Sequence, residues 1–152
     1  MNLKEAIAEI TPSLLAMRRE FHRYPELAFQ ELRTSAKLAE FLEGLGLEVT
    51  RGVAGTGVVA RLRGARPGKT VLVRADMDAL PIQEASGVPF SSENPGVMHA
   101  CGHDGHAAIV AHVAAVLARW RKDLEGEVRF VFQPAEEIVA GARPMVEAGV
   151  LE

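Results

Sequence analysis

The sequence predicts an α/β protein in which flanking helices cover a layered sheet. Segments whose apolar residues recur every three or four positions alternate along the chain with short runs rich in valine and leucine. Glycine and proline separate these segments. Hydrophobic residues make up 48% of the chain and charged residues 24%, so the chain can bury a core and disorder is not expected. Helices interleaved with buried strands are typical of an α/β layered sheet.

Three segments carry helical patterns. Residues 3–23 place apolar side chains three or four apart, and Thr11-Pro12 could start a fresh turn and break this helix. Residues 32–43 repeat the pattern and should end at one of the two glycines that follow. Residues 105–120 are apolar on nearly all sides, which predicts a buried helix with His112 as a core residue.

Four short apolar segments are expected to be strands. They are rich in valine, leucine and phenylalanine and are bounded by turn residues. The segments are residues 47–53, 57–62, 70–74 and 127–132. No internal repeat, linker or low-complexity tract separates them.

Charge and composition exclude several classes of partner. The formal net charge is -3 and the 17 basic residues are scattered among 20 acidic ones, so neither nucleic acid nor an anionic membrane is an expected partner. No apolar run approaches the ~18 residues of a membrane span, and no signal peptide is recognisable. A single cysteine cannot form an internal disulfide. We therefore expect a cytoplasmic protein.

Residues 98–106, Met-His-Ala-Cys-Gly-His-Asp-Gly-His, form a dense set of metal-binding side chains. Thiolate, imidazole and carboxylate are the donors that Zn and its first-row neighbours prefer. Cys101 and His103 stand two residues apart beside glycines that permit a tight bend. The single cysteine excludes a closed site of four cysteines, or of two cysteines and two histidines, so an open catalytic site fits better. For His99 and His106, a ligand role and an ordinary polar role remain equally open.

Two acidic pairs follow expected strands. Asp76 and Asp78 come after the third strand, and Glu136 and Glu137 come after the fourth. Ligands of α/β sheets gather beyond the carboxyl ends of strands, so both pairs and the Cys-x-His loop are expected to converge. One glutamate could bind an ion while its neighbour serves as general base toward bound water. Asp78 could then accept from a ligand imidazole and fix its tautomer.

Four blocks of the sequence, in order, resemble the M20 metallopeptidase family. The nearest branch is that of aminoacylase-like amidohydrolases, which includes hippurate hydrolases, N-acyl-L-amino-acid amidohydrolases, auxin-conjugate hydrolases and thermostable carboxypeptidases. The resemblance implies the fold of a zinc-peptidase-like catalytic domain. The blocks that carry it are residues 18–26, 74–81, 98–106 and 133–137.

The resemblance also implies roles for particular residues. Cys101, His103 and Glu137 would be ligands of a site for two divalent ions, which could be Zn, Mn, Co or Ni. Glu136 would be the general base and Asp78 a supporting catalytic residue, while Asp76 stands where other branches carry a metal-binding histidine. The implied reaction is metal-dependent hydrolysis of the amide bond of N-acyl amino acids or small peptides.

Length is the departure from the family. Family members are more than twice as long, with a lid and dimerisation domain and two further histidine ligands located after the part that matches this chain. We therefore expect residues 1–152 to form an incomplete catalytic domain that lacks the lid domain and the rest of the catalytic domain. Unpaired sheet edges would favour a homo-oligomer. An inactive metal-binding or oligomerising fragment is the alternative.

Two rival functions have some support in the sequence. Gly55-Thr-Gly57-Val-Val-Ala60 matches the dinucleotide fingerprint, but that motif must open a helix, and a strand is expected here instead. We interpret this stretch as a hairpin. A cysteine hydrolase would use Cys101 as nucleophile with His103 or His106 as base. That rival explains neither acidic pair.

Overall fold

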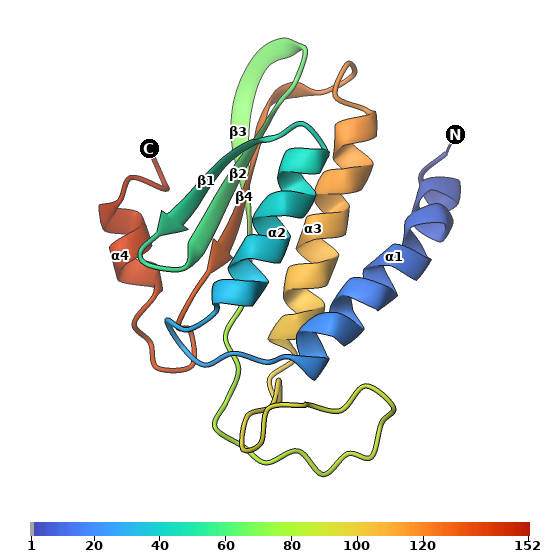
Figure 1. The fold of residues 1–152 in the computed structure, drawn as a ribbon. Coiled ribbons are helices and arrows are strands. Elements are labelled where there is room, and N and C mark those ends of the chain that lie inside the picture. Colours follow the sequence, from blue (N-terminus) through green and yellow to red (C-terminus); the bar gives the residue numbers. More distant parts are fainter. Residues whose placement is uncertain (1) are drawn as a thin grey trace.

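The computed structural model describes residues 2–152 as four helices and four strands (Figure 1). In chain order they are α1 (Leu3–Arg23), α2 (Leu32–Gly44), β1 (Glu48–Val53), β2 (Gly57–Arg63), β3 (Arg66–Asp76), α3 (His103–Arg119), β4 (Glu125–Gln133) and α4 (Ala142–Glu147). The predicted α/β class is therefore confirmed. None of the helices in the described part of the chain is both long and apolar enough to span a membrane.

The strands form one mixed sheet in the order β1-β2-β4-β3. β3 and β4 run parallel, whereas β1 with β2 and β2 with β4 are antiparallel. The parallel register pairs Asp76 with Gln133, so β3 and β4 end side by side. The segments that follow these two strands therefore leave the sheet at the same end.

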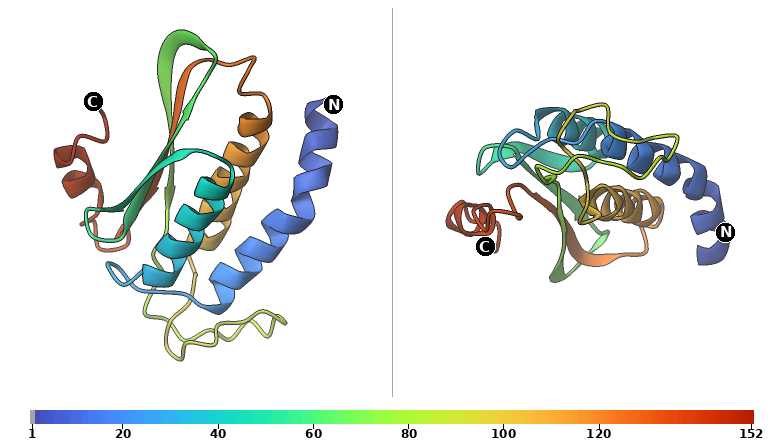
Figure 2. Two further views of the ribbon diagram at one scale, coloured as in Figure 1. Left: turned by 45° about the horizontal axis from the view of Figure 1, so that its top comes forward. Right: turned by 90° about the horizontal axis from the view of Figure 1, so that it is seen from below.

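Helices cover the two faces of the sheet unequally. α1, α2 and α3 lie on one face, and α4 lies on the other (Figure 2). The larger core, between the sheet and the three helices, contains fully buried Phe130, Phe132 and Leu38. The smaller core, beneath α4, includes Val131 and Met145. Phe130 and Phe132 alternate with Val131, as expected for a strand that is buried on both faces.

Helix α1 is continuous, so Thr11-Pro12 does not break it. The Thr11 hydroxyl donates to the Ile7 carbonyl at 2.7 Å within the helix. Contacts to α3 hold α1 on both sides of the proline: Arg119 pairs with Glu9 at 2.8 Å, and His112 bonds to the Ser13 hydroxyl at 3.1 Å. Tertiary packing therefore outweighs the missing N–H of Pro12.

Several boundaries differ from the sequence-based expectation. β3 is longer than residues 70–74 at both ends, because Arg66 pairs with Glu125 at the start of β4 and Asp76 pairs with Gln133 at its end. α3 begins at His103 instead of residue 105, since Gly102 adopts φ 80° and lets the chain enter the helix there. The six-residue helix α4 was not predicted.

Two expectations about single motifs are confirmed. Residues 55–60 form the turn and second strand of the β1–β2 hairpin, so no helix follows the glycines and the dinucleotide-binding alternative is wrong. His112 is buried in the core, where its Nδ1–H donates to the Ala108 carbonyl at 2.8 Å. Burial lowers the pKa of His112, which is consistent with a neutral core histidine.

Candidate metal centre

The parallel strands β3 and β4 bring the predicted site residues together. Asp76 ends β3 and is followed by Asp78, while Glu136 and Glu137 lie three and four residues beyond the end of β4. The first turn of α3, with His103 at its start, lies beside both strand ends. The expected convergence of the two acidic pairs with the Cys-x-His loop is present in the structure.

Two overlapping clusters could each hold a metal ion. Ligand atoms of Cys101, His103 and Glu137 lie within 4.8 Å of one another, and so do those of Asp76, His103 and His106. His103 is buried and belongs to both clusters, whereas Cys101 is exposed. The first cluster is the ligand set that the sequence resemblance implied.

His103 is oriented from behind. Its Nδ1 lies 2.9 Å from the backbone carbonyl of Asp78, and because a carbonyl oxygen only accepts, Nδ1 carries the hydrogen. The Asp78 carboxylate is also near, at 3.3 Å. Nε2 is left facing the carboxylates of Asp76, Glu136 and Glu137, each at 3.7 Å. Burial disfavours the charged ring, but the hydrogen bonds to Asp78 and the charges of Asp76 and Asp78 raise the pKa of His103.

A tight turn after β4 places the two glutamates. The Glu137 N–H donates to Asp78 Oδ2 at 2.9 Å, which ties this turn to the end of β3. Ala135 has φ 52°, a left-handed conformation that a non-glycine residue adopts only where its surroundings hold it. The carbonyl of Ala135 accepts from the N–H of Gly141, which closes the turn. A Cβ on Gly141 would lie 1.6 Å from the Pro134 oxygen, so only glycine fits there.

Sequence reasoning missed Glu31, which supports this turn from the start of α2. Its side chain is fully buried and accepts from the Ala135 N–H at 2.9 Å and from the Thr56 hydroxyl at 2.5 Å. A buried carboxylate is costly unless such donors satisfy it. Glu31 and Ala135 are 104 positions apart, and nothing in the sequence around Glu31 indicates this pairing.

The residues present fit a divalent cation. Glu137 Oε1 is buried and has no hydrogen-bond partner among the described residues, which is unusual for a carboxylate oxygen. The interaction of Glu137 with the Cys101 thiol, together with burial and nearby negative charge, raises the pKa of that thiol. A bound cation would satisfy the oxygen and favour the thiolate. The raised pKa is the opposite of what an activated cysteine nucleophile needs.

The remaining predicted residues lie around this centre. Asp76 accepts from His106 Nδ1 at 2.7 Å and pairs with Arg74 at 3.3 Å. Burial opposes ionisation of Asp76, but the hydrogen bond to His106 and the charges of His103 and Arg74 lower its pKa. His99 is buried, neither ring nitrogen has a partner among the described residues, and desolvation lowers its pKa to about 4.

Comparison with known proteins agrees with this geometry. The profile of Peptidase family M20/M25/M40 matches residues 72–152. The chain is 49% identical over 152 residues to the N-acyl-L-amino acid amidohydrolase of Geobacillus stearothermophilus, covering 99% of this chain and 41% of that one. It is 41% identical to the hippurate hydrolase of Campylobacter jejuni, covering 100% of this chain and 39% of the relative. The chain thus spans well under half the length of these relatives.

Solved structures show the same fold at high similarity. The Bacillus subtilis YXEP protein, a dinuclear metal binding peptidase from the M20 family, matches with a TM-score of 0.91 and 47% identity over 95% of this chain and 41% of that chain. A putative aminohydrolase from methicillin resistant Staphylococcus aureus matches with a TM-score of 0.94 and 42% identity over 97% and 38%. With the family match and the site geometry, these likenesses show that the chain belongs to Peptidase family M20/M25/M40.

Proposed function

We propose that this chain is the metal-binding part of an amidohydrolase that cleaves the amide bond of N-acyl amino acids or small peptides. The observation that carries the proposal is the cluster of Cys101, His103 and Glu137, with Glu136 beside it. Relatives of the chain include an N-acyl-L-amino acid amidohydrolase and a hippurate hydrolase. Both names describe hydrolysis of an amide on the nitrogen of an amino acid.

In this proposal the thiolate of Cys101, Nε2 of His103 and the carboxylate of Glu137 hold a divalent ion. Such an ion supplies Lewis acidity to the acyl carbonyl and acidifies water. Glu136 is the general base: its side chain is 42% exposed, and Oε2 is 3.7 Å from His103 Nε2, beside the proposed ion position. It would take a proton from the attacking water and pass it to the departing amine nitrogen.

Asp78 acts in this proposal as a positioning residue. Its carbonyl fixes the tautomer of His103, and its carboxylate holds the Glu137 N–H. Such contacts orient ligands and raise their affinity for metal. The two glutamates thus differ in role: Asp78 holds the backbone N–H of Glu137, whose side chain is only 14% exposed, whereas the side chain of Glu136 is 42% exposed and open to water.

We further propose that the complete site holds two ions and draws additional ligands from polypeptide beyond these residues. The two clusters of the described residues share His103, whose Nδ1 is already occupied by Asp78. The remaining ring nitrogen, Nε2, can bind only one ion, so it cannot complete both clusters. In the same proposal residues 1–152 are an incomplete catalytic domain without the lid domain.

The exposed edge of the sheet supports a proposal of self-association. β3 is an edge strand of 11 residues, with Val71 57% and Leu72 38% exposed. A long unpaired apolar edge favours pairing with further chain or with another copy. The alternative function, an inactive metal-binding fragment, makes the same prediction about assembly but not about catalysis.

We also propose that the protein is located in the cytoplasm, where Cys101 would stay reduced.

A chimaera tests the proposed reaction. Residues 1–152 would replace the matching part of the Geobacillus stearothermophilus amidohydrolase, which is 49% identical. We expect the chimaera to hydrolyse N-acyl amino acids. A chelator should abolish this activity, and Zn, Mn, Co or Ni should restore it. A folded chimaera that binds metal but cleaves no N-acyl amino acid or dipeptide would refute the amidohydrolase assignment and leave the binding alternative.

A further inference from the structure

A second buried polar cluster lies behind the metal centre and connects three separate parts of the chain. His22 comes from the last turn of α1, Glu84 from the segment of residues 77–102, and Asp104 from the first turn of α3. The side chains are 6%, 2% and 0% exposed, respectively. Arg18, one turn before His22, completes the cluster. None of these residues is a metal ligand in the proposed site.

His22 makes two short contacts to carboxylates at once. Nδ1 lies 2.8 Å from Asp104 Oδ2 and Nε2 lies 3.0 Å from Glu84 Oε1. A neutral imidazole has one donating and one accepting nitrogen, whereas an ionised carboxylate only accepts. Both contacts are therefore hydrogen bonds only when both ring nitrogens carry hydrogen, which makes the ring a cation.

The charges of the cluster agree with a cationic ring. Arg18 Nε also donates to Asp104 Oδ2, at 2.8 Å. With His22 charged, two cations face two carboxylates; with a neutral ring, a buried site would carry one unpaired negative charge, which is costly. Burial opposes ionisation of Glu84, but hydrogen bonds from Ser86, the Ser92 N–H and His22 lower its pKa to about 2. Glu84 is therefore an ionised acceptor at neutral pH.

The cluster fixes the segment that carries the metal-binding loop. Residues 77–102 form a long irregular excursion between β3 and α3 (Figure 1). A bridge between Leu80 and Met98, with two hydrogen bonds of 3.0 Å, closes its neck three residues before Cys101. Its far part is held on α1, where the Phe90 ring packs edge-on against His22 at 5.4 Å. Asp104 follows His103 directly.

We infer that His22 is a doubly hydrogen-bonded cation that acts as a positioning residue, locking residues 77–102 and the first turn of α3 to α1 so that Cys101 and His103 are held in ligand geometry. The charge state and the lock stand on the contacts themselves. The consequence for ligand geometry rests on the proposed metal function. His22 touches neither ion nor substrate.

The ring charge can be measured on the unmodified chain without metal. Ring nitrogen NMR at neutral pH separates a cation, whose two nitrogens resonate close together, from a neutral ring, whose nitrogens resonate far apart. His112 is the internal reference, because its Nδ1 donates to a carbonyl while Nε2 contacts a hydroxyl. We expect the cation pattern for His22 and the neutral pattern for His112. A neutral pattern for His22 at pH 7 would overturn the inference.

The positioning role is tested by His22→Asn, with His112→Asn as the control at a second buried histidine. In His22→Asn we expect faster amide hydrogen exchange across residues 98–107, whereas His112→Asn should leave exchange there unchanged relative to the rest of α3. His22→Lys, which restores the positive charge, should recover part of the protection. Equal exchange of residues 98–107 in the parent chain and His22→Asn would overturn the lock.

Cobalt binding links the lock to the metal centre. Co²⁺ bound by the Cys101 thiolate gives a charge-transfer absorption, and we expect His22→Asn to weaken Co²⁺ binding by about 10–100-fold, as for other residues that orient ligands. His112→Asn should bind like the parent. A parent chain that shows no such band would count against the proposed metal site, while the ring and exchange measurements would still decide the role of His22.

Discussion

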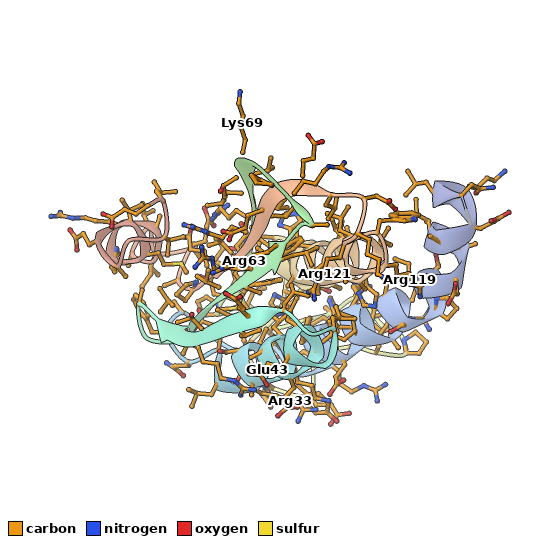
Figure 3. The ribbon with its side chains drawn as sticks, turned by 90° about the horizontal axis from the view of Figure 1, so that it is seen from above. Arg33, Glu43, Arg63, Lys69, Arg119 and Arg121 are labelled. Atoms are coloured by element: carbon orange, nitrogen blue, oxygen red, sulfur yellow. The ribbon has the colours of Figure 1, made fainter. Side chains whose placement is uncertain are left out.

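The two ends of the sheet hold their charged residues in opposite ways. At the amino end of β3, Lys69 points away from the body of the protein (Figure 3). Two ion pairs there are exposed on both sides: Arg63 with Glu48 is 60% and 60% exposed, and Arg66 with Glu125 is 57% and 65%. Such pairs contribute little to stability.

At the carboxyl ends of β3 and β4 the charges are buried instead. Asp78 and Asp104 have fully buried side chains, and each has one oxygen without a hydrogen-bond partner among the described residues. Burying a carboxylate without satisfying it costs free energy that a solvated surface avoids. The comparison teaches that buried carboxylates with an unsatisfied oxygen, more than the number of charges, identify the functional end of this protein.

The largest expected effect separates Glu136 from a glutamate on the surface of α4. In the chimaera, Glu136→Gln should lower kcat by about 10²- to 10⁴-fold, the range for loss of a general base, with metal content unchanged. Glu147→Gln is the matched control, because Glu147 is exposed on α4 and pairs with Arg143. Initial rates and metal analysis give both numbers. Retained turnover in Glu136→Gln would remove Glu136 from the role of base.

Cys101 gives the second test, on the 152-residue chain itself. Cys101→Ser replaces a soft thiolate by a poor ligand, so Co²⁺ affinity should fall by at least about 10–100-fold and the thiolate absorption should disappear. His112→Asn serves as the control. If chelation left the activity of the chimaera intact while iodoacetamide on Cys101 abolished it, the cysteine hydrolase would be the better interpretation.

Two glycines test the backbone at the two functional segments. Gly141→Ala places a Cβ 1.6 Å from the Pro134 carbonyl oxygen, so the turn that holds Glu136 and Glu137 must move. We expect a loss of about 1–3 kcal/mol in unfolding free energy and weaker metal binding. Gly105→Ala, in the first turn of α3, meets no atom within 4 Å and should be tolerated. Urea unfolding of both variants measures the difference. Equal stability would show that the turn can relax.

The convergence of the site could be predicted because it depends only on the order of segments along the chain. Two neighbouring parallel strands end at the same end of the sheet, and the polar residues directly follow these strands. The sequence did not predict the roles of His22 and Glu31, because these roles depend on contacts with residues that lie 82 and 104 positions further along the chain. Neither did it predict that Asp78 would orient His103 through its backbone carbonyl, which every residue type possesses. Helix α4 was missed because six residues give too little periodicity.

Acid should open the functional end before the core unfolds. Burial opposes ionisation of Glu84, but hydrogen bonds from Ser86, the Ser92 N–H and His22 lower its pKa from 4.5 to about 2. A lowered folded-state pKa means that the stabilisation is complete above about pH 4.5 and is lost as the pH falls toward 2. The Ser92 amide proton, which donates to Glu84 at 2.6 Å, should report this titration by NMR. Glu84→Gln should remove the inflection, and Glu93→Gln, on an exposed residue of the same segment, should retain it.

The smallest expected effect lies at the opposite end of the sheet. Arg66 and Glu125 join the starts of β3 and β4 at 3.0 Å, but both side chains are more than half exposed. A double-mutant cycle with Arg66→Ala and Glu125→Ala should give a coupling of only about 0.2–1 kcal/mol, and salt should reduce it further. A coupling of several kcal/mol would show that exposure does not separate the two ends. In that case the buried, unsatisfied carboxylates around the metal centre would lose their value as markers of function.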